Sequence, residues 1–366
     1  MSGDRVAVFQ RRAGGGTPRG STLFEKGTTR WVRNYDPWRK ERKVQETDRH
    51  DPRYDVVVVG GGSAGLSAAL VFGRSRRRTL LLDAGEPRNA PSSGVHGFFS
   101  RDGIPPQELL KIGREQLEPY PSVEARSARV TGTSGGNGDF EVILDNGEVV
   151  RSRKLLLATG VIDELPDKPG FKEFWGRGVY HCPYCHGWEV RDRPLAVLTP
   201  GEGAAERAAF IRNWSRDLVL LTDGPANLNE EGRRTLRALD IPVGEERISH
   251  LEGDPGGAAG GLRRIHFEGG SSLDREGLFY VPPQRQGSEL AQMLGCEIVA
   301  MGQAPAGVKS DPTTRETTVA GVYVAGDAGN AVQSALLAGA SGANAAFFVN
   351  HSLVADEVAA AVGATA

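Results

Sequence analysis

Short apolar runs alternate with helical stretches along most of the chain. Residues 55–59 form a continuous, mostly β-branched run, which is typical of a strand buried on both faces of a parallel sheet. A helical stretch at residues 66–76 and a second apolar run at 79–82 follow it. This order of strand, helix and strand predicts that a parallel α/β sheet begins at about residue 54.

The same alternation continues to residue 348. The dipeptide Asn146-Gly147 separates two apolar stretches and predicts a hairpin, whereas the glycine-rich residues 254–261 predict a loop. Helices are predicted at residues 105–117, 202–213, 229–238, 288–294 and 333–348. Strands are predicted at residues 140–144, 148–150, 154–160, 194–198, 218–221, 262–267, 278–281 and 321–327. The last helix is rich in small residues, so it can lie close to another backbone or to a cofactor.

A glycine-rich turn, residues 60–65, connects the first strand to the first helix in a G-x-G-x-x-G pattern. Gly60 would make the tight turn, Gly62 would let backbone N–H groups approach a pyrophosphate, and Gly65 would allow close helix–strand packing. Asp83, at the end of the second strand, is placed to bind ribose hydroxyls. The unit predicts dinucleotide binding; the alternative is a glycine-rich turn beside a solvated Asp83.

Two of the three cysteines stand in the motif His181-Cys182-Pro183-Tyr184-Cys185-His186. A C-x-x-C pair can close a disulphide, and the pKa of one of its thiols is commonly lowered. Three cysteines are too few for a disulphide framework, so the motif indicates redox or metal chemistry. A structural zinc site is the alternative, but zinc normally needs four ligands. We therefore expect a redox dithiol and no bound metal.

Composition narrows the class of protein. Hydrophobic residues make up 39% and charged residues 25% of the 366 residues, which is typical of a soluble globular protein. The net charge of −2 argues against nucleic-acid binding, and no apolar run reaches membrane-spanning length. Because no signal peptide is apparent and cysteines are few, we expect a cytoplasmic protein. Residues 1–53 are basic and lack an apolar period, which predicts a flexible tail.

Four motifs follow one another in the order found in a known family. They are the glycine-rich turn, Ala-Thr-Gly at residues 158–160, the C-x-x-C within residues 178–187, and Gly326-Asp327 followed by Gln333. From about residue 54 onward the chain resembles the low-molecular-weight thioredoxin reductases, which are FAD-dependent pyridine nucleotide-disulphide oxidoreductases.

The resemblance implies an α/β fold of two Rossmann-like domains, each with three ββα layers, and typically a homodimer. The FAD-binding domain would comprise residues 54–167 and 299–352. An inserted domain of the NAD(P)-binding type, residues 168–298, would carry the C-x-x-C. Residues 1–53 and 353–366 would be terminal extensions.

The resemblance also implies roles for single residues. Cys185 would face the flavin, and Cys182 would exchange with the substrate. Asp327 would bind the ribityl and pyrophosphate region, and Gln333 would lie beside the isoalloxazine ring. The full set expected to bind FAD is Gly60, Gly62, Ser63, Ala64, Gly65, Asp83, Thr159, Gly160, Gly326, Asp327 and Gln333.

His186 departs from the family, which usually has an aspartate acid/base after the second cysteine. Imidazole titrates near neutrality and can take or give a thiol proton, so we expect His186 to act in catalysis with the two cysteines. A histidine that only caps the helix is the alternative. A histidine here also resembles the dithiol oxidases of gliotoxin and holomycin biosynthesis, which close a disulphide in a small metabolite and pass the electrons to O₂.

The nicotinamide-binding motifs also depart from the family. Thr199 replaces the first glycine of the second G-x-G-x-x-A pattern, and a segment containing Asp223 replaces the basic cluster that binds the 2′-phosphate of NADP. Asp223 would repel a phosphate and could at best bind a ribose diol. NADPH, NADH, another electron donor and no nicotinamide at all stay open.

These observations predict an FAD-dependent thiol/disulphide oxidoreductase that moves two electrons between the flavin and Cys182–Cys185. The partner would be a thioredoxin-like protein or a small-molecule disulphide or dithiol. One alternative is an O₂-dependent dithiol oxidase, and another is a flavin-binding redox sensor that turns nothing over. We expect His96 to be an ordinary surface or core histidine, the alternative being that its loop approaches the flavin or the dithiol. We expect Cys296 to be buried by packing.

Overall fold

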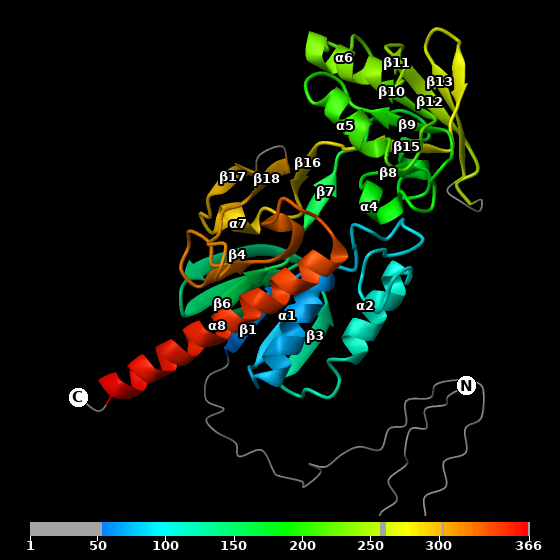
Figure 1. Cartoon of the computed structure of the whole chain (residues 1–366). Helices are drawn as coiled ribbons and strands as arrows, with labels where there is room; N and C mark the ends of the chain where they lie inside the picture. Colours follow the sequence, from blue (N-terminus) through cyan, green and yellow to red (C-terminus); the bar gives the residue numbers. More distant parts are fainter. Residues whose placement is uncertain (1–52, 257–260, 302–303, 365–366) are drawn as a thin grey trace, which may run out of the picture. The chain divides into compact units, whose positions relative to one another are not determined.

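The computed structural model describes residues 53–256, 261–301 and 304–364. The predicted tail, apart from residue 53, and residues 257–260 of the predicted loop lie outside the described residues. Residues 51–366 form one compact unit. In it a seven-stranded and a five-stranded sheet carry helices and smaller sheets (Figure 1).

The seven-stranded sheet is centred on β1 (Tyr54–Val59) and β6 (Val149–Leu157), which run parallel. On the outer side of β1 lie β2 (Thr79–Asp83) and then β3 (Val123–Ser127), also parallel. β19 (Val322–Val324) joins in parallel beside the end of β6. The carboxyl ends of β1, β2, β6 and β19 therefore meet at one edge, where ligands bind in open α/β sheets.

β6 is one continuous strand, although the sequence predicted separate strands at residues 148–150 and 154–160. Its first half pairs antiparallel with β5 (Asp139–Leu144), which pairs antiparallel with β4 (Val130–Gly136). Its second half pairs with β1 and β19. The polar residue Ser152 in the middle hides this continuity from a pattern analysis. It is buried, and its hydroxyl accepts a hydrogen bond from the backbone N–H of Val57 at 3.0 Å.

Both faces of this sheet are covered. The even-numbered valines of β1 share a core cluster with residues of α1 (Ser63–Arg74), α2 (Pro106–Glu115) and α8 (Ala335–Gly363), which lie on one side (Figure 1). The odd-numbered valines belong to the cluster of the opposite face. Cys296 is buried in that second cluster, as predicted. The β-branched run of β1 thus reflects burial on both faces.

α8 begins near the predicted position but continues to residue 363 instead of 348. It lies so close to α1 that a Cβ at Gly342 would be 2.0 Å from the carbonyl oxygen of Ala64. The prediction of close backbone packing by this small-residue helix is confirmed. By length and composition alone α8 could also cross a membrane, which differs from the sequence expectation, although core helices pass the same test.

The five-stranded sheet is entirely parallel, in the order β11-β10-β9-β15-β8. Its strands are β8 (Val179–Tyr180), β9 (Leu195–Leu198), β10 (Leu218–Leu221), β11 (Val243–Gly244) and β15 (Gly277–Tyr280). Because β8 ends at Tyr180, the C-x-x-C follows directly at the carboxyl edge of the sheet. The sheet therefore fixes where the dithiol begins.

This second sheet is also sandwiched between two layers. Helices α5 (Ala204–Ile211) and α6 (Glu230–Ala238) share a core cluster with alternate residues of β9 and β10. The other residues of these strands pack against an antiparallel sheet of β12 (Ile248–Gly253), β13 (Leu262–Phe267) and β14 (Ser272–Asp274). A seven-stranded sheet with a parallel half and a wholly parallel five-stranded sheet, both covered by helices, confirm the predicted fold class of two Rossmann-like domains.

Shorter elements complete the described chain. β7 pairs with β16 and β17 with β18, both antiparallel, and the predicted helix at residues 288–294 is the single turn α7. The bounds are α3 (Phe171–Phe174), α4 (Pro183–His186), α7 (Leu290–Met293), η2 (Gly326–Ala328), β7 (Val161–Asp163), β16 (Gln284–Gln286), β17 (Ile298–Met301) and β18 (Ala304–Val308).

Candidate active site

The turn between β1 and α1 has no room for side chains at two of its glycines. Gly60 has φ +109°, and a Cβ there would lie 2.3 Å from the carbonyl oxygen of Ala158. A Cβ at Gly65 would lie 1.8 Å from the carbonyl oxygen of Gly60. Gly62, in contrast, meets nothing within 4 Å and is the N-cap of α1 without a capping side chain. The first turn of α1 therefore presents N–H groups suited to an anion.

A cavity of about 400 Å³ lies at this turn. Every residue predicted to bind the cofactor lines it except Gly65, which packs against Gly60 instead. The dithiol lines the same cavity, because Cys182, Cys185 and His186 are among its wall residues. The structure thus brings the four sequence motifs to one cavity.

Asp83 lies beside the turn, where a Cβ at Gly61 would be 2.4 Å from its carboxylate. Its Oδ1 accepts a hydrogen bond from the N–H of Gly85 at 3.1 Å, and its Oδ2 accepts one from Arg114 at 3.0 Å. The carboxylate is held at the cavity wall in the position predicted for a ribose contact.

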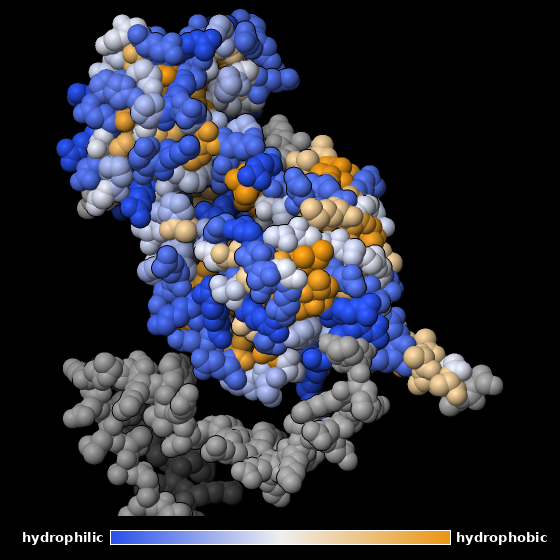
Figure 2. Space-filling model, turned by 180° about the vertical axis from the view of Figure 1, so that it is seen from behind, coloured by the Kyte–Doolittle hydropathy of each residue, from blue (hydrophilic) through white to orange (hydrophobic). Residues whose placement is uncertain are grey.

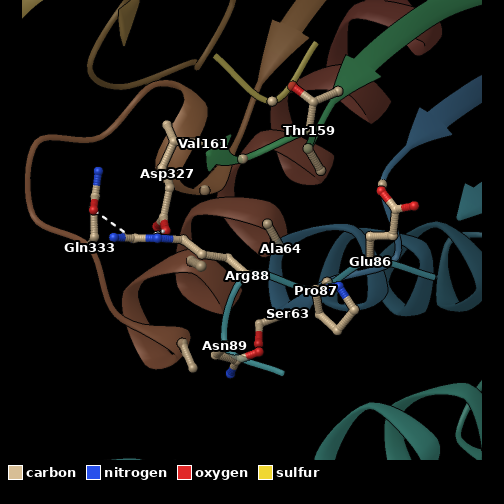
Figure 3. A pocket seen from close by; sticks show the side chains of 18 of the residues that line it. Ser63, Ala64, Glu86, Pro87, Arg88, Asn89, Thr159, Val161, Asp327 and Gln333 are labelled. Carbon is tan, nitrogen blue, oxygen red and sulfur yellow. Dashed lines mark hydrogen bonds and ion pairs between the residues drawn. The ribbon is translucent and has the colours of Figure 1, made fainter. Parts of the chain in front are cut away.

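Sequence reasoning missed Arg88, which lies in the middle of the cavity wall (Figure 3). Its guanidinium forms two bonds with Asp163, at 2.7 and 2.8 Å, and donates to Asp327 at 3.1 Å and to Gln333 Oε1 at 2.6 Å. Burial lowers the pKa of Arg88, but the hydrogen bonds and charges of Asp163 and Asp327 together outweigh burial and raise it overall. Burial raises the pKa of Asp327, and Arg88 opposes that rise.

Gln284 closes this cluster. Its amide donates to Asp163 at 2.6 Å, and its Oε1 accepts from the amide of Gln333 at 2.9 Å. Arg88, Asp163 and Gln284 come from segments far from the Asp327–Gln333 motif, so no local motif could have revealed their place in the cluster. These hydrogen bonds fix the positions of the Asp327 carboxylate and the Gln333 amide.

The dithiol lies at the amino end of the short helix α4, whose N-cap is Cys182. Both cysteines are free thiols. A hydrogen bond from Cys185 lowers the pKa of Cys182 to about 7 against the effect of burial, with help from backbone N–H groups of Cys185 and Tyr184 and from the charge of Arg207. The same bond, together with burial, raises the pKa of Cys185. In the reduced pair Cys182 is therefore the better thiolate.

His186 is enclosed by three neighbours. Its Nε2 lies 2.9 Å from the hydroxyl oxygen of Ser92, and its ring stacks on Tyr180 with a centroid distance of 4.8 Å. The edge of His96 approaches with a centroid distance of 6.2 Å. Burial, followed by the nearby His96 and His181, lowers the pKa of His186 to about 4. Burial also lowers the pKa of His181 to about 4, with Arg88 adding to the effect.

The expectation that His96 is an ordinary surface or core histidine is wrong. The loop after β2 carries it to the cavity wall beside His186, and Glu189 lies 3.6 Å from its Nδ1. Its loop position gave no periodic signal, so the sequence could not place it.

Aromatic side chains surround the outer side of the dithiol. Tyr184, between the two cysteines, is 74% exposed and makes edge-to-face contacts with Phe210 and Trp214. Trp188 is 67% exposed and lies under the guanidinium of Arg191. An exposed aromatic surface of this kind binds apolar ligands or peptide surfaces.

The second glycine-rich turn follows β9 and begins at Thr199, whose hydroxyl bonds the carbonyl oxygen of Leu198. Asp223, expected to repel a phosphate and at best to bind a ribose diol, is paired within the fold. Both of its carboxylate oxygens lie 2.7 Å from Nζ of Lys168, and Oδ1 also accepts from the N–H of Ile248 at 2.6 Å. These residues do not fit a nicotinamide coenzyme as a ribose or phosphate site.

The first turn and its cavity do fit FAD. The open α1 terminus, the carboxylate of Asp83, and the narrow glycine turn match the pyrophosphate and ribose of a dinucleotide. Among the described residues there is no group of three or more His, Cys, Asp and Glu side chains that could hold a metal ion.

A dinucleotide-type turn and a C-x-x-C on one cavity define the class of disulphide oxidoreductases that use a nucleotide cofactor. Residues 54–342 match the pyridine nucleotide-disulphide oxidoreductase family, and the chain belongs to this family.

Individual relatives narrow the class. The solved structure of HlmI is 39% identical, with a TM-score of 0.79 over 86% of this chain and 97% of that one. An oxidoreductase from Agrobacterium tumefaciens is 34% identical, with a TM-score of 0.76 over 82% and 99%. Thioredoxin reductase tcpT of Claviceps purpurea is 31% identical over 82% of this chain and 95% of that protein. The chain is thus a thioredoxin-reductase-like flavin disulphide oxidoreductase, as the sequence predicted.

Proposed function

We propose that the chain binds FAD in the cavity at the β1–α1 turn and exchanges two electrons between it and the Cys182–Cys185 pair. The carrying observation is that the glycine turn and both cysteines line one cavity. Bound FAD would supply the two-electron acceptor or donor. The remaining residues predicted for the cofactor, including Asp327 and Gln333, would hold it in place.

Each residue of the dithiol motif has a role in this proposal. Cys182 is the thiolate that exchanges with substrate, because its pKa is lowered to about 7. Cys185, whose pKa is raised, faces the flavin and carries the proton. Burial lowers the pKa of His186 to about 4, so its ring is neutral at pH 7 and has a free lone pair for a thiol proton, although the same shift makes it a weaker base.

The substrate would be a thioredoxin-like protein or a small molecule with a disulphide or a dithiol. The exposed ring of Tyr184, directly between the cysteines, supports an apolar contact at the point of exchange. In the reductive direction one substrate disulphide and two electrons with two protons give two thiols. In the oxidative direction the same balance runs backwards.

The test is an anaerobic titration of the purified protein with a small dithiol, followed through the visible flavin band. Wild type should bleach, whereas Cys182→Ser and Cys185→Ser should bleach at least about a hundred-fold more slowly, because each removes a covalent step. Cys296→Ser is the matched control, since Cys296 is buried beside Thr317, outside the cavity wall. A protein without flavin, or equal bleaching in all four proteins, would refute the proposal.

A second candidate is an O₂-dependent dithiol oxidase, in which a small dithiol and O₂ give a cyclic disulphide and H₂O₂. The ion pair between Asp223 and Lys168 favours it, because the acid that could at best have bound a coenzyme ribose is bound by the fold. His186 supports it through its likeness to the dithiol oxidases. Production of one H₂O₂ per dithiol in air, without any nicotinamide, would establish it; rapid reduction by NADPH or NADH would exclude it.

We also propose that the chain acts in the cytoplasm as a homodimer, without membrane or nucleic acid. Phe347, Val354 and Val358 are exposed apolar residues on α8 and support a self-contact. The C-terminal end of α8 projects from the rest of the molecule and is coloured as hydrophobic (Figure 2). Light scattering should give twice the chain mass, and Val354→Glu together with Val358→Glu should give the single mass. A monomeric wild type, or the protein in the membrane fraction of fractionated cells, would contradict this proposal.

A further inference from the structure

The loop that follows β2 brings a hydroxyl group to the catalytic histidine proposed above. Ser92 Oγ lies 2.9 Å from His186 Nε2, although 94 positions separate the two residues. The same loop is held against the dithiol segment by a hydrogen bond from Arg177 to the carbonyl oxygen of Pro91 at 3.1 Å. The contact between Ser92 and His186 therefore lies in a supported part of the structure.

A serine hydroxyl has one proton, and in Ser92 that proton is already used. Oγ donates it to the carbonyl oxygen of Gly94 at 2.8 Å, which cannot be a donor itself. The N–H of Gly94 points at the same oxygen from 3.3 Å. Towards His186 the hydroxyl can therefore only accept. His186 Nε2 must carry the proton, and the neutral ring has its lone pair on Nδ1.

His186 Nδ1 has no hydrogen-bond partner and is shielded from solvent. A buried acceptor without a partner is rare and often marks a functional group. Tyr180, stacked on the ring at an interplanar angle of 20°, and His96, nearly perpendicular to it at 77°, fix the plane of the imidazole. The side chain thus has one fixed donor and one unused acceptor, and it lines the cavity together with both cysteines.

We propose that Ser92 is a positioning residue that holds His186 in the Nε2–H tautomer, so that Nδ1 is the atom that takes the proton of a reacting thiol. In that step the S–H bond breaks, an N–H bond forms at Nδ1, and the electron pair stays on sulphur as the thiolate. In the reverse direction the imidazolium returns the same proton. The inference deepens the proposed function and rests on the role given there to His186.

Nitrogen NMR of the ¹⁵N-histidine-labelled full chain tests the tautomer directly, and His186→Gln identifies the signals of His186. Wild type should show a protonated Nε2 and an unprotonated Nδ1. Ser92→Ala should give a mixture of tautomers, and Ser92→Thr, which keeps the hydroxyl, should restore the wild-type signals. An Nδ1–H tautomer in wild type, or an unchanged tautomer in Ser92→Ala, would overturn the inference.

Ser249 provides the matched control, because its hydroxyl oxygen lies 2.9 Å from Nδ1 of His250 in a similar contact outside the cavity wall. Ser249→Ala should alter the signals of His250 and of His266, which stacks on it, and leave those of His186 unchanged. In dithiol exchange kinetics, Ser92→Ala should lower the rate by about three- to ten-fold, as expected for one lost orienting hydrogen bond, and Ser249→Ala should not. If His186→Gln left the exchange rate unchanged, the proposed role of His186 would fail, whereas the tautomer assignment would stand or fall on the NMR signals.

Discussion

Both Rossmann-like domains begin with a strand, a glycine-rich turn, a helix and a second strand. They differ in the surroundings of the acidic residue that follows the second strand. In the first, Gly62 faces open space and Asp83 lies on the cavity wall. In the second, Gly201 and Gly203 face open space as well, yet Asp223 is bound by Lys168. The shape of a dinucleotide-binding turn is thus present twice. Asp83 lines the cavity, although Arg114 also binds it, whereas Asp223 is not among the wall residues of that cavity. We therefore expect the first turn, and not the second, to bind a nucleotide.

The largest contrast is expected from substitutions in the two turns. Gly65→Val places a side chain 1.8 Å from the backbone oxygen of Gly60, so it should cost about 3 kcal/mol or more and remove the flavin. Gly203→Ala meets no neighbouring atom and should cost about 1 to 2 kcal/mol through its φ of +83° alone, with flavin retained. Urea unfolding and the flavin content measure both. Equal losses would mean that the two turns are packed alike.

Lowering the pH should reduce stability mainly through the dithiol region, and less through either glycine-rich turn. The pKa of His186 falls from 6.5 to about 4 on folding, so the unfolded chain binds more protons between these values. The stabilising contribution is complete above pH 6.5 and is lost as the pH falls to about 4, by roughly 3 kcal/mol for this residue. His96, His181 and Tyr180 face the ring, and protonated His96 or His181 would oppose its charge. Urea unfolding of His186→Gln should show a weaker dependence on pH than wild type; identical curves would contradict the lowered pKa.

Removing the ion pair between Lys168 and Asp223 should have a smaller effect on stability. Lys168→Met leaves the partly buried carboxylate of Asp223 with only its backbone donor, which should lower stability by about 1 kcal/mol. The exposed Lys172→Met is the matched control and should be neutral. Thermal unfolding measures both variants. A neutral Lys168→Met would show that Asp223 is not committed to the fold, and the contrast between the two turns would lose its basis.

The smallest expected change concerns the thiolate. Arg207 contributes to the lowered pKa of Cys182, so Arg207→Met should raise the midpoint of about 7 by roughly half a unit. The rate of iodoacetamide alkylation against pH, in a Cys296→Ser background, gives this midpoint. Arg212→Met, at the end of the same helix, should leave it in place. If the midpoint were unchanged in both variants, Arg207 would not contribute to the lowered pKa of Cys182.

Local patterns predicted the fold and the motifs that line the cavity, because their information lies within short segments. The valines of β1, the turn at residues 60–65 and the C-x-x-C each depend on neighbours in the sequence. The same approach divided β6 in two, since the buried Ser152 is polar. It also ended α8 too early.

Contacts between distant segments could not be predicted in this way. Arg88 meets Asp163, Asp327 and Gln333 at sequence separations of 75, 239 and 245 residues. The pairing of Asp223 with Lys168 spans 55 positions. In each case a charged residue looks like solvent-exposed surface until the fold supplies its partner, so the sequence did not reveal the partner of Asp223.

The central claim is that the domain with the seven-stranded sheet holds a flavin against the dithiol, whereas the domain with the five-stranded sheet has no fitting site for a nicotinamide coenzyme. Anaerobic stopped-flow mixing of the wild-type protein with a small dithiol, NADPH or NADH, read at the visible flavin band, tests it most directly. The dithiol should bleach the flavin at least about a hundred-fold faster than either nicotinamide, because only the dithiol has a built path through Cys182 and Cys185. Bleaching by NADPH or NADH as fast as by the dithiol would contradict the account.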